Sequence, residues 1–215
     1  TDEIVLGSAI FEGCTNLKQV TINVTDADHT WDKNVSNIFD KAFVETLIIG
    51  ENTTKIVSTV LYNTNVQTLS LHAGISIPTI NSFVSNLQLA NVIIRDGGAN
   101  QVDEDFLRAV NNNKAVKTLV LGENVNVANN AFAILKTVTN VTISHAAITE
   151  NVFANSAVTH VTLTKRGDST SIPSTVLGYL PITMQTLTFA NGITQLENAT
   201  TAVLSKDTFA SLKSV

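Results

Sequence analysis

The sequence predicts a repeat solenoid in which short strands stack into one parallel β-sheet, and three observations support this fold class. A phrase of the form apolar-x-apolar recurs along the chain, successive phrases begin about 20 to 27 residues apart, and two further apolar positions precede most of them. Such a period is typical of solenoids, in which neighbouring repeats build a shared core. In chain order the phrases are Val20-Thr21-Ile22, Leu47-Ile48-Ile49, Leu69-Ser70-Leu71, Val92-Ile93-Ile94, Leu119-Val120-Leu121, Val141-Thr142-Ile143, Val161-Thr162-Leu163 and Leu187-Thr188-Phe189.

Each phrase is expected to be a strand, because alternate residues of a strand face opposite sides of the sheet. In the first phrase Val20 and Ile22 should point inward while Thr21 points outward. The inward residues would then form a ladder of aliphatic side chains. Each contributes roughly 1.5–3 kcal/mol when fully buried.

Two apolar landmarks precede the strands. The first is a bulky residue about eight to ten positions before most phrases, and the second is an apolar residue between the bulky one and the apolar-x-apolar phrase. The bulky residues are Phe11, Phe39, Leu61, Phe83, Phe132, Phe153 and Leu177, and the intermediate ones are Leu17, Val66, Leu89, Val116, Val138, Val158 and Met184. We expect the bulky residues to close the side of the core that faces away from the sheet.

The repeat unit itself has a recognisable form. The segments 9–22 and 151–163 both fit Phe-x-x-(Cys/Asn/Ser)-x-x-(Leu/Val)-x-x-Val-x-(Ile/Leu), the second with one residue fewer. This form resembles the BspA-like, or Treponema pallidum-type, leucine-rich repeat family over nearly the whole chain. The resemblance implies a right-handed leucine-rich-repeat solenoid with a parallel concave β-sheet and an irregular, turn-rich or short-helical convex side. The Ile-Pro that usually follows the strand in this family is absent after the strands here.

We expect residues 1–215 to form a single domain of about eight complete repeats and a partial ninth, within a longer protein. The longer repeats carry insertions at 25–34, 97–105 and 165–174, which are rich in Asp, Asn, Gly and Ser and therefore favour turns. An acidic start followed by an apolar pattern predicts a short helix over 103–110.

Composition excludes some classes of partner. The net charge is −5 and Lys165-Arg166 is the only adjacent basic pair, whereas nucleic-acid binding requires clustered Lys and Arg. No apolar run approaches the length of about 18 residues that a membrane helix needs, so no direct membrane insertion by this segment is expected. The chain contains 29 Thr and 23 Asn but only 14% charged residues. Such a surface is common in secreted bacterial proteins, although Thr and Asn also suit exposed strands and tight turns.

Few residues suggest chemistry. The single cysteine, Cys14, excludes an internal disulfide, and the resemblance implies that it is a buried apolar filler. The loop 26–32 combines three Asp with His29, but Trp31 and Asn37 occupy the places where a calcium loop needs Gly and Glu. A solvated acidic loop is favoured, and cation binding there stays open. We expect no catalytic residue, no metal and no cofactor.

The candidate ligand-binding surface is the outward, concave face of the sheet. Three of its residues are apolar where water is expected, and exposed apolar groups rimmed by polar ones can mark a protein-binding site. The alternative is that Ile and Val simply favour strands. The surface consists of Ile48, Ser70, His72, Ile93, Arg95, Val120, Thr142, His160 and Thr162.

These features favour a non-enzymatic, extracellular or cell-surface module that binds a protein or glycan, such as a component of a host extracellular matrix. Surface exposure and adhesion are what the resemblance implies. Three alternatives remain: a structural spacer without a specific ligand, a polysaccharide-active parallel β-helix, and a cytosolic scaffold. The outward strand positions contain no Asp or Glu, which argues against the enzyme.

Overall fold

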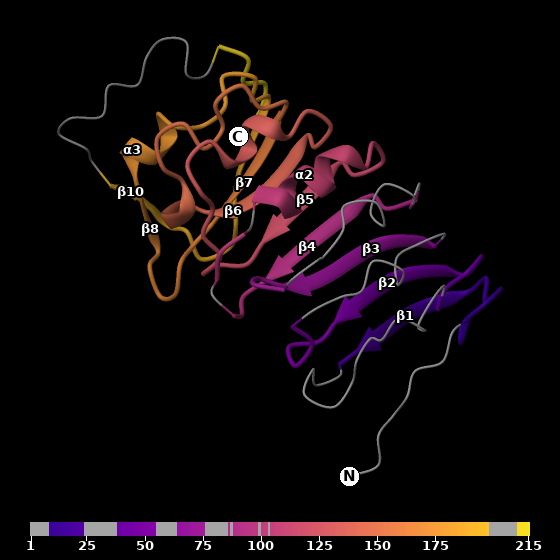
Figure 1. Ribbon diagram of the computed structural model, residues 1–215. Coiled ribbons are helices and arrows are strands. Elements are labelled where there is room, and N and C mark those ends of the chain that lie inside the picture. Colours follow the sequence, from indigo (N-terminus) through magenta and orange to yellow (C-terminus); the bar gives the residue numbers. More distant parts are fainter. Residues whose placement is uncertain are drawn as a thin grey trace.

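The computed structural model describes residues 9–23, 38–54, 64–75, 86, 88–98, 100–102, 104–197 and 210–215. Eight strands form one parallel sheet whose spatial order follows the sequence order (Figure 1). Every strand phrase predicted from the sequence lies in this sheet, so the predicted solenoid is confirmed. The strands are β1 (Leu17–Ile22), β2 (Phe43–Ile49), β3 (Asn65–His72), β4 (Asn91–Arg95), β5 (Thr118–Leu121), β6 (Asn140–Ser144), β7 (His160–Thr164) and β9 (Thr186–Phe189).

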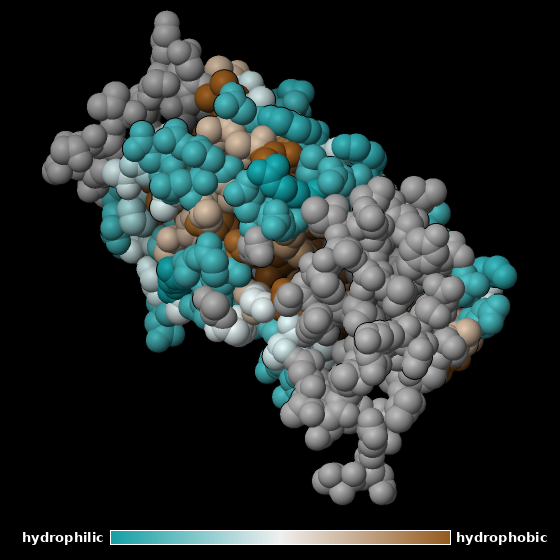
Figure 2. All heavy atoms as spheres, viewed as in Figure 1, coloured by the Kyte–Doolittle hydropathy of each residue, from teal (hydrophilic) through white to brown (hydrophobic). Residues whose placement is uncertain are grey.

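The register aligns the inward residues into a continuous column. From Leu47 to Leu187 no member of this column is more than 3% exposed. On the face shown in Figure 2, hydrophilic residues cover most of the described surface and hydrophobic ones lie largely in recesses. The column consists of Val20, Leu47, Leu69, Val92, Leu119, Val141, Val161 and Leu187.

The bulky landmarks close the core as expected. Phe39 and Phe132 are fully buried and Phe153 is 3% exposed, whereas Phe11 in the first repeat is half-buried. Successive aromatic rings touch: those of Phe11 and Phe39 stack at 5.2 Å, and those of Phe132 and Phe153 meet at 5.0 Å with a 58° tilt. These contacts couple the first repeat to the second and the sixth to the seventh. The landmarks at positions 61 and 83 lie outside the described residues.

A ladder of buried asparagines ties the chain where it turns into the strands. Asn86 Nδ2 donates to Val66 O at 3.2 Å, and Asn113 Nδ2 donates to Asn86 O at 2.8 Å. The side-chain oxygen of Asn113 accepts the Ala115 N–H at 3.0 Å. Both asparagines are 1% exposed, so these bonds satisfy backbone groups that water cannot reach. Cys14 occupies the equivalent position in the first repeat, where it is half-buried against the core.

In the described part of the chain, the side of the solenoid away from the sheet carries short helical pieces, as expected. The predicted helix is present as α2 (Glu104–Asn112), which buries an apolar face including Phe106 and Leu107. Its first turn carries Glu104 and Asp105, which favour the positive end of the helix dipole. The other pieces are η1 (Ala131–Ile134), η2 (His145–Ala147) and α3 (Ser174–Leu177). None of the helices among the described residues has the length and apolar character needed to cross a membrane.

A small second sheet was not predicted. The strand β8 (Ser171–Pro173) pairs in parallel with β10 (Gln195–Glu197), next to α3 in Figure 1. Part of the insertion 165–174 is therefore extended and paired, whereas its composition had favoured turns. The pairing joins residues more than 20 positions apart, so local turn propensity does not decide it. The insertion at 25–34 and the acidic loop 26–32, with Trp31, lie outside the described residues.

Candidate functional site

The outward residues at the middle of each strand form one unbroken column, which we call the central column. Strand pairing places each of its members directly beside the next across the whole sheet. It consists of Thr21, Ile48, Ser70, Ile93, Val120, Thr142, Thr162 and Thr188. Because neighbouring strands lie about 4.8 Å apart, these side chains form a continuous surface strip.

The central column changes character along the solenoid. Ile48, Ile93 and Val120 are half-buried and form an apolar stripe, which only the hydroxyl of Ser70 interrupts. From β6 onward the column is threonine: Thr142 and Thr162 are half-buried and Thr188 is exposed. The sheet face therefore has an apolar half and a hydroxyl-bearing half.

Ser70 differs from the expectation that it presents its side chain to a ligand. It is only 6% exposed, between Ile48 and Ile93 in the column. A short side chain between two bulky β-branched neighbours is covered by them. A ligand on this face would therefore contact the two isoleucines first.

A polar column borders the central column on one side. Asn91 Nδ2 donates to Thr68 Oγ1 at 3.2 Å, which links β4 to β3. His160 is exposed, and its Nδ1 lies 2.8 Å from the hydroxyl of Thr159. The column, aligned by the same strand pairing, consists of Gln19, Thr46, Thr68, Asn91, Thr118, Asn140, His160 and Thr186.

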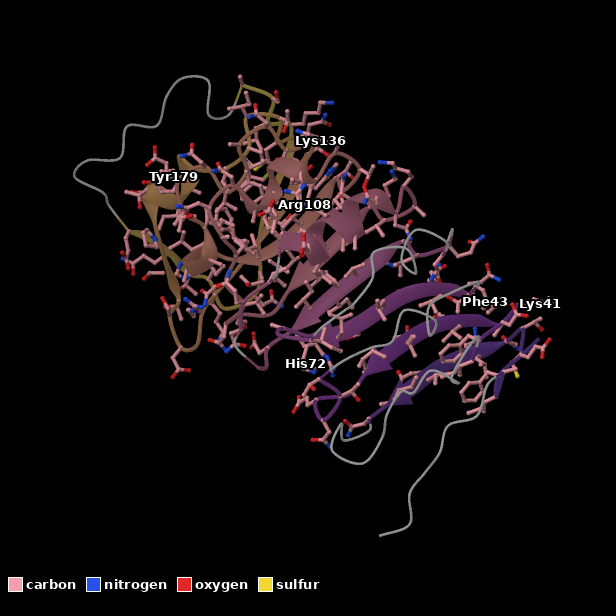
Figure 3. All side chains as sticks on the ribbon, viewed as in Figure 1. Lys41, Phe43, His72, Arg108, Lys136 and Tyr179 are labelled. Atoms are coloured by element: carbon pink, nitrogen blue, oxygen red, sulfur yellow. The ribbon has the colours of Figure 1, made fainter. Side chains whose placement is uncertain are left out.

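The expected outward presentation of His72 is wrong. His72 is 4% exposed, with Nε2 at 2.7 Å from Thr53 O and Nδ1 at 3.0 Å from Ala73 O. Figure 3 shows it at the end of β3. Both ring nitrogens lie against backbone carbonyls, so the imidazole links strand ends and is not available to a ligand.

Arg95 also has a structural role in the sheet. It pairs with His72 in the register of β3 and β4, and its Nη2 donates to Ile49 O of β2. Its Nε is buried without a hydrogen-bond partner among the described residues. The guanidinium therefore reaches across β3 to β2, and changing it would disturb the sheet as well as any surface.

Glycines let Asn and Asp side chains join neighbouring repeats at the strand ends. Asn23 Oδ1 accepts the Asn52 N–H at 3.0 Å, and Asp96 Oδ1 accepts the Asn124 N–H at 2.8 Å. In both places a Gly-Glu-Asn tripeptide, at 50–52 and 122–124, receives the bond. The recurrence of this tripeptide is the sequence signal that could have revealed these junctions.

Potential metal-binding side chains do not cluster in the described part of the chain. No three His, Cys, Asp or Glu side chains gather there in a way that could hold a metal ion. Burial lowers the pKa of His145 below its ordinary value of 6.5, the Arg166 guanidinium lowers it further, and Glu197 acts in the opposite direction. His145 lies in η2, outside the sheet, and does not contribute to the sheet face.

Comparison with known proteins supports the repeat assignment. A family model described as "BspA type Leucine rich repeat region" matches residues 3–100 and 108–202, in six copies. Neither a curated protein nor a solved structure matches the chain significantly. The match covers more than half of the 215 residues and includes every strand of the large sheet.

Proposed function

The chain belongs to the BspA-type leucine-rich repeat family, and from this premise we propose that it is a cell-surface or secreted module that mediates adhesion by binding a protein on its concave sheet face. Proteins of this repeat family are generally non-enzymatic and typically surface-exposed or secreted, and leucine-rich repeats usually bind proteins. The solenoid suits this role because its stacked strands create one extended surface.

The observation that carries the proposal is the apolar stripe of Ile48, Ile93 and Val120. These side chains remain partly open to solvent at the middle of a sheet whose inner face is closely packed. Polar groups, including Asn91 and Thr118, border the stripe. An apolar centre with a polar rim is the arrangement of a typical protein-binding interface.

The two halves of the sheet face define what a ligand should offer. Apolar side chains would pack over the stripe, since burying the remaining exposed area of Ile93 and Val120 is favourable. Hydrogen-bonding groups would meet Thr142, Thr162 and His160 in the other half. A protein surface or an extended polypeptide supplies both kinds of contact along the length of the column.

The proposal is tested by applying the purified chain to an array of extracellular-matrix proteins. The double variant Ile93→Arg, Val120→Arg places two cations on adjacent positions of the stripe, which should weaken saturable binding at least about tenfold. Its matched control is Thr21→Arg, Thr188→Arg, which makes the same change on exposed threonines at the two ends of the same column.

Because Ile93 and Val120 are half-buried, a second variant separates folding from binding. The change Ile93→Thr, Val120→Thr keeps the β-branched shape and strand preference but removes apolar area. Weaker binding with an unchanged thermal midpoint supports the proposal. The absence of saturable binding by the parent at tens of micromolar would favour the spacer alternative. If the control Thr21→Arg, Thr188→Arg loses as much binding as Ile93→Arg, Val120→Arg, the binding site is not the apolar stripe.

A further inference from the structure

A second surface feature lies away from the sheet. A hollow of about 420 Å³ opens between the segments that lead into β7 and β9. One wall is the turn at 150–155 and the other is the turn at 178–182, which follows α3. In Figure 3, Tyr179 lies at the opposite end of the molecule from Lys41 and Phe43. The hollow thus shares no residue with the concave face.

Both walls are held in place by local hydrogen bonds. In the first wall, Ala154 N donates to Asn151 O at 3.0 Å, and Lys136 Nζ donates to Asn155 O. In the second wall, Tyr179 N donates to Val176 O at 3.0 Å. Phe153 and Leu180, which line the hollow, are 3% and 4% exposed and anchor the walls in the core. The hollow is therefore preformed, as small-molecule sites usually are.

The rim of the hollow combines an aromatic ring with unengaged polar groups. Tyr179 is 36% exposed and Ile182 is 72% exposed, so both apolar surfaces face solvent. Glu150, Asn151 and Asn155 are also exposed. Within the described part of the chain, the side chains of these three residues and the Tyr179 hydroxyl make no hydrogen bond or ion pair.

We propose that this hollow binds a neutral pyranose ring at the end of a glycan. A pyranose has an apolar C–H face that can pack on Tyr179 and Ile182. Its hydroxyl groups can donate to the Glu150 carboxylate and can pair with the amides of Asn151 and Asn155. Sites for small ligands use this combination of apolar surface and a few convergent polar groups.

Other ligand chemistries fit the hollow less well. An aliphatic peptide side chain would cover the amides without giving them hydrogen-bond partners, which is costly. An anionic group would face the carboxylate of Glu150, while the nearby ammonium of Lys136 is engaged with the Asn155 carbonyl. A neutral polyol with one apolar face satisfies both kinds of lining.

The inference is independent of the proposed function, because the two surfaces share no residue. Its test uses the 15N-labelled 215-residue chain, titrated separately with methyl β-D-glucopyranoside, methyl β-D-galactopyranoside and methyl N-acetyl-β-D-glucosaminide. Saturable shifts of amide signals from 150–155 and 178–182 are expected with at least one glycoside. A dissociation constant of about 1 mM or weaker is expected for so small a ligand.

Matched variants test separately what the Tyr179 ring and the asparagine amides contribute to glycoside binding. Tyr179→Ala should weaken binding about fivefold or more, whereas Tyr179→Phe keeps the apolar face and should retain most of it. Asn151 and Asn155 have φ values of 69° and 58°, so Asn151→Gly and Asn155→Gly remove the amides without backbone strain. Each glycine variant should weaken binding while leaving the thermal midpoint nearly unchanged.

The inference is overturned if none of the three glycosides saturates, or if the shifts fall elsewhere in the chain. It is also overturned if Tyr179→Ala binds as tightly as the parent, or if N-acetyl-leucine amide binds at the hollow and the glycosides do not. The sheet-face variant Ile93→Arg, Val120→Arg should keep glycoside binding. Its retention, with loss of matrix-protein binding, would show that the two surfaces act separately.

Discussion

The carboxylate of Asp96 lies where a side chain at Gly122 would have to be. A Cβ on Gly122 would come within 2.4 Å of Asp96 Oδ1 and 2.7 Å of Asp96 N. Asp96 instead spans this gap to bond Asn124, at 2.8 Å to the backbone N–H and 3.0 Å to the side-chain amide. Because Gly122 has no side chain, Asp96 of one repeat can hydrogen-bond to Asn124 of the next.

Replacing Gly122 by alanine should destabilise the solenoid. The new methyl group would displace the Asp96 carboxylate and press on its backbone nitrogen, at a cost of about 1–3 kcal/mol in the free energy of unfolding. Chemical denaturation measures this cost. Gly178→Ala is the control, because a Cβ there would come no closer than 3.4 Å to its nearest neighbour, Thr175 O, and the φ of −71° suits any residue. Equal stability of the two variants would contradict the role of Gly122.

Truncating Phe153 should destabilise the fold strongly. Its ring is 3% exposed and meets Phe132 at 5.0 Å, so Phe153→Ala leaves a cavity between two repeats and costs about 3–5 kcal/mol. Thermal unfolding followed by circular dichroism measures the loss. Ile182→Ala, at a residue 72% exposed, should change the midpoint little. A Phe153→Ala melt that matches the parent would refute its place in the core.

Removing the amide of Asn113 should cost about 1–3 kcal/mol, because Asn86 O and Ala115 N would lose their partners in a buried place. The variant Asn113→Ala is compared with Asn112→Ala, which changes the neighbouring exposed asparagine at the end of α2. Denaturant unfolding should show a clear loss only for Asn113. Equal effects of the two changes would mean that the buried ladder contributes nothing beyond local helix stability.

His145 should make the fold less stable in acid. Its pKa is lowered in the folded protein, so the unfolded chain binds the proton more readily and protonation favours unfolding. The contribution of neutral His145 to stability is complete above its ordinary pKa of 6.5 and is lost as the pH falls below that value. The parent midpoint should therefore fall more between about pH 7 and pH 5 than that of His145→Gln.

A control with another histidine makes this pH test specific. The control is His160→Gln, which makes the same substitution at an exposed position of the sheet face, away from η2. If His145→Gln and the parent lose stability equally in acid, carboxylates and not His145 account for the effect.

The strands were predictable because their pattern is local and repeated. Val141-Thr142-Ile143 alternates inward and outward residues, and seven other phrases show the same alternation, so the register repeats from strand to strand. The helix α2 was also predictable, since Glu104 and Asp105 precede a run with an apolar face. Both signals lie within a few residues of sequence.

The site was less predictable, because exposure depends on what neighbouring repeats place over a residue. Ser70 and His72 occupy outward positions in the strand alternation, yet both are buried, the one between two isoleucines and the other against the carbonyls of Thr53 and Ala73. The hollow at Tyr179 joins the segments 150–155 and 178–182, and neither segment carries a distinctive motif.

The sequence by itself therefore determined the repeat family, the strands and the aliphatic core, because each follows from a periodic pattern of apolar residues. The tertiary structure alone decided which outward side chains remain open, how Asp96 and Gly122 join two repeats, and that β8 pairs with β10. These features arise mainly from contacts between residues 19 or more positions apart, where stacking geometry, and not local propensity, sets the distance between groups.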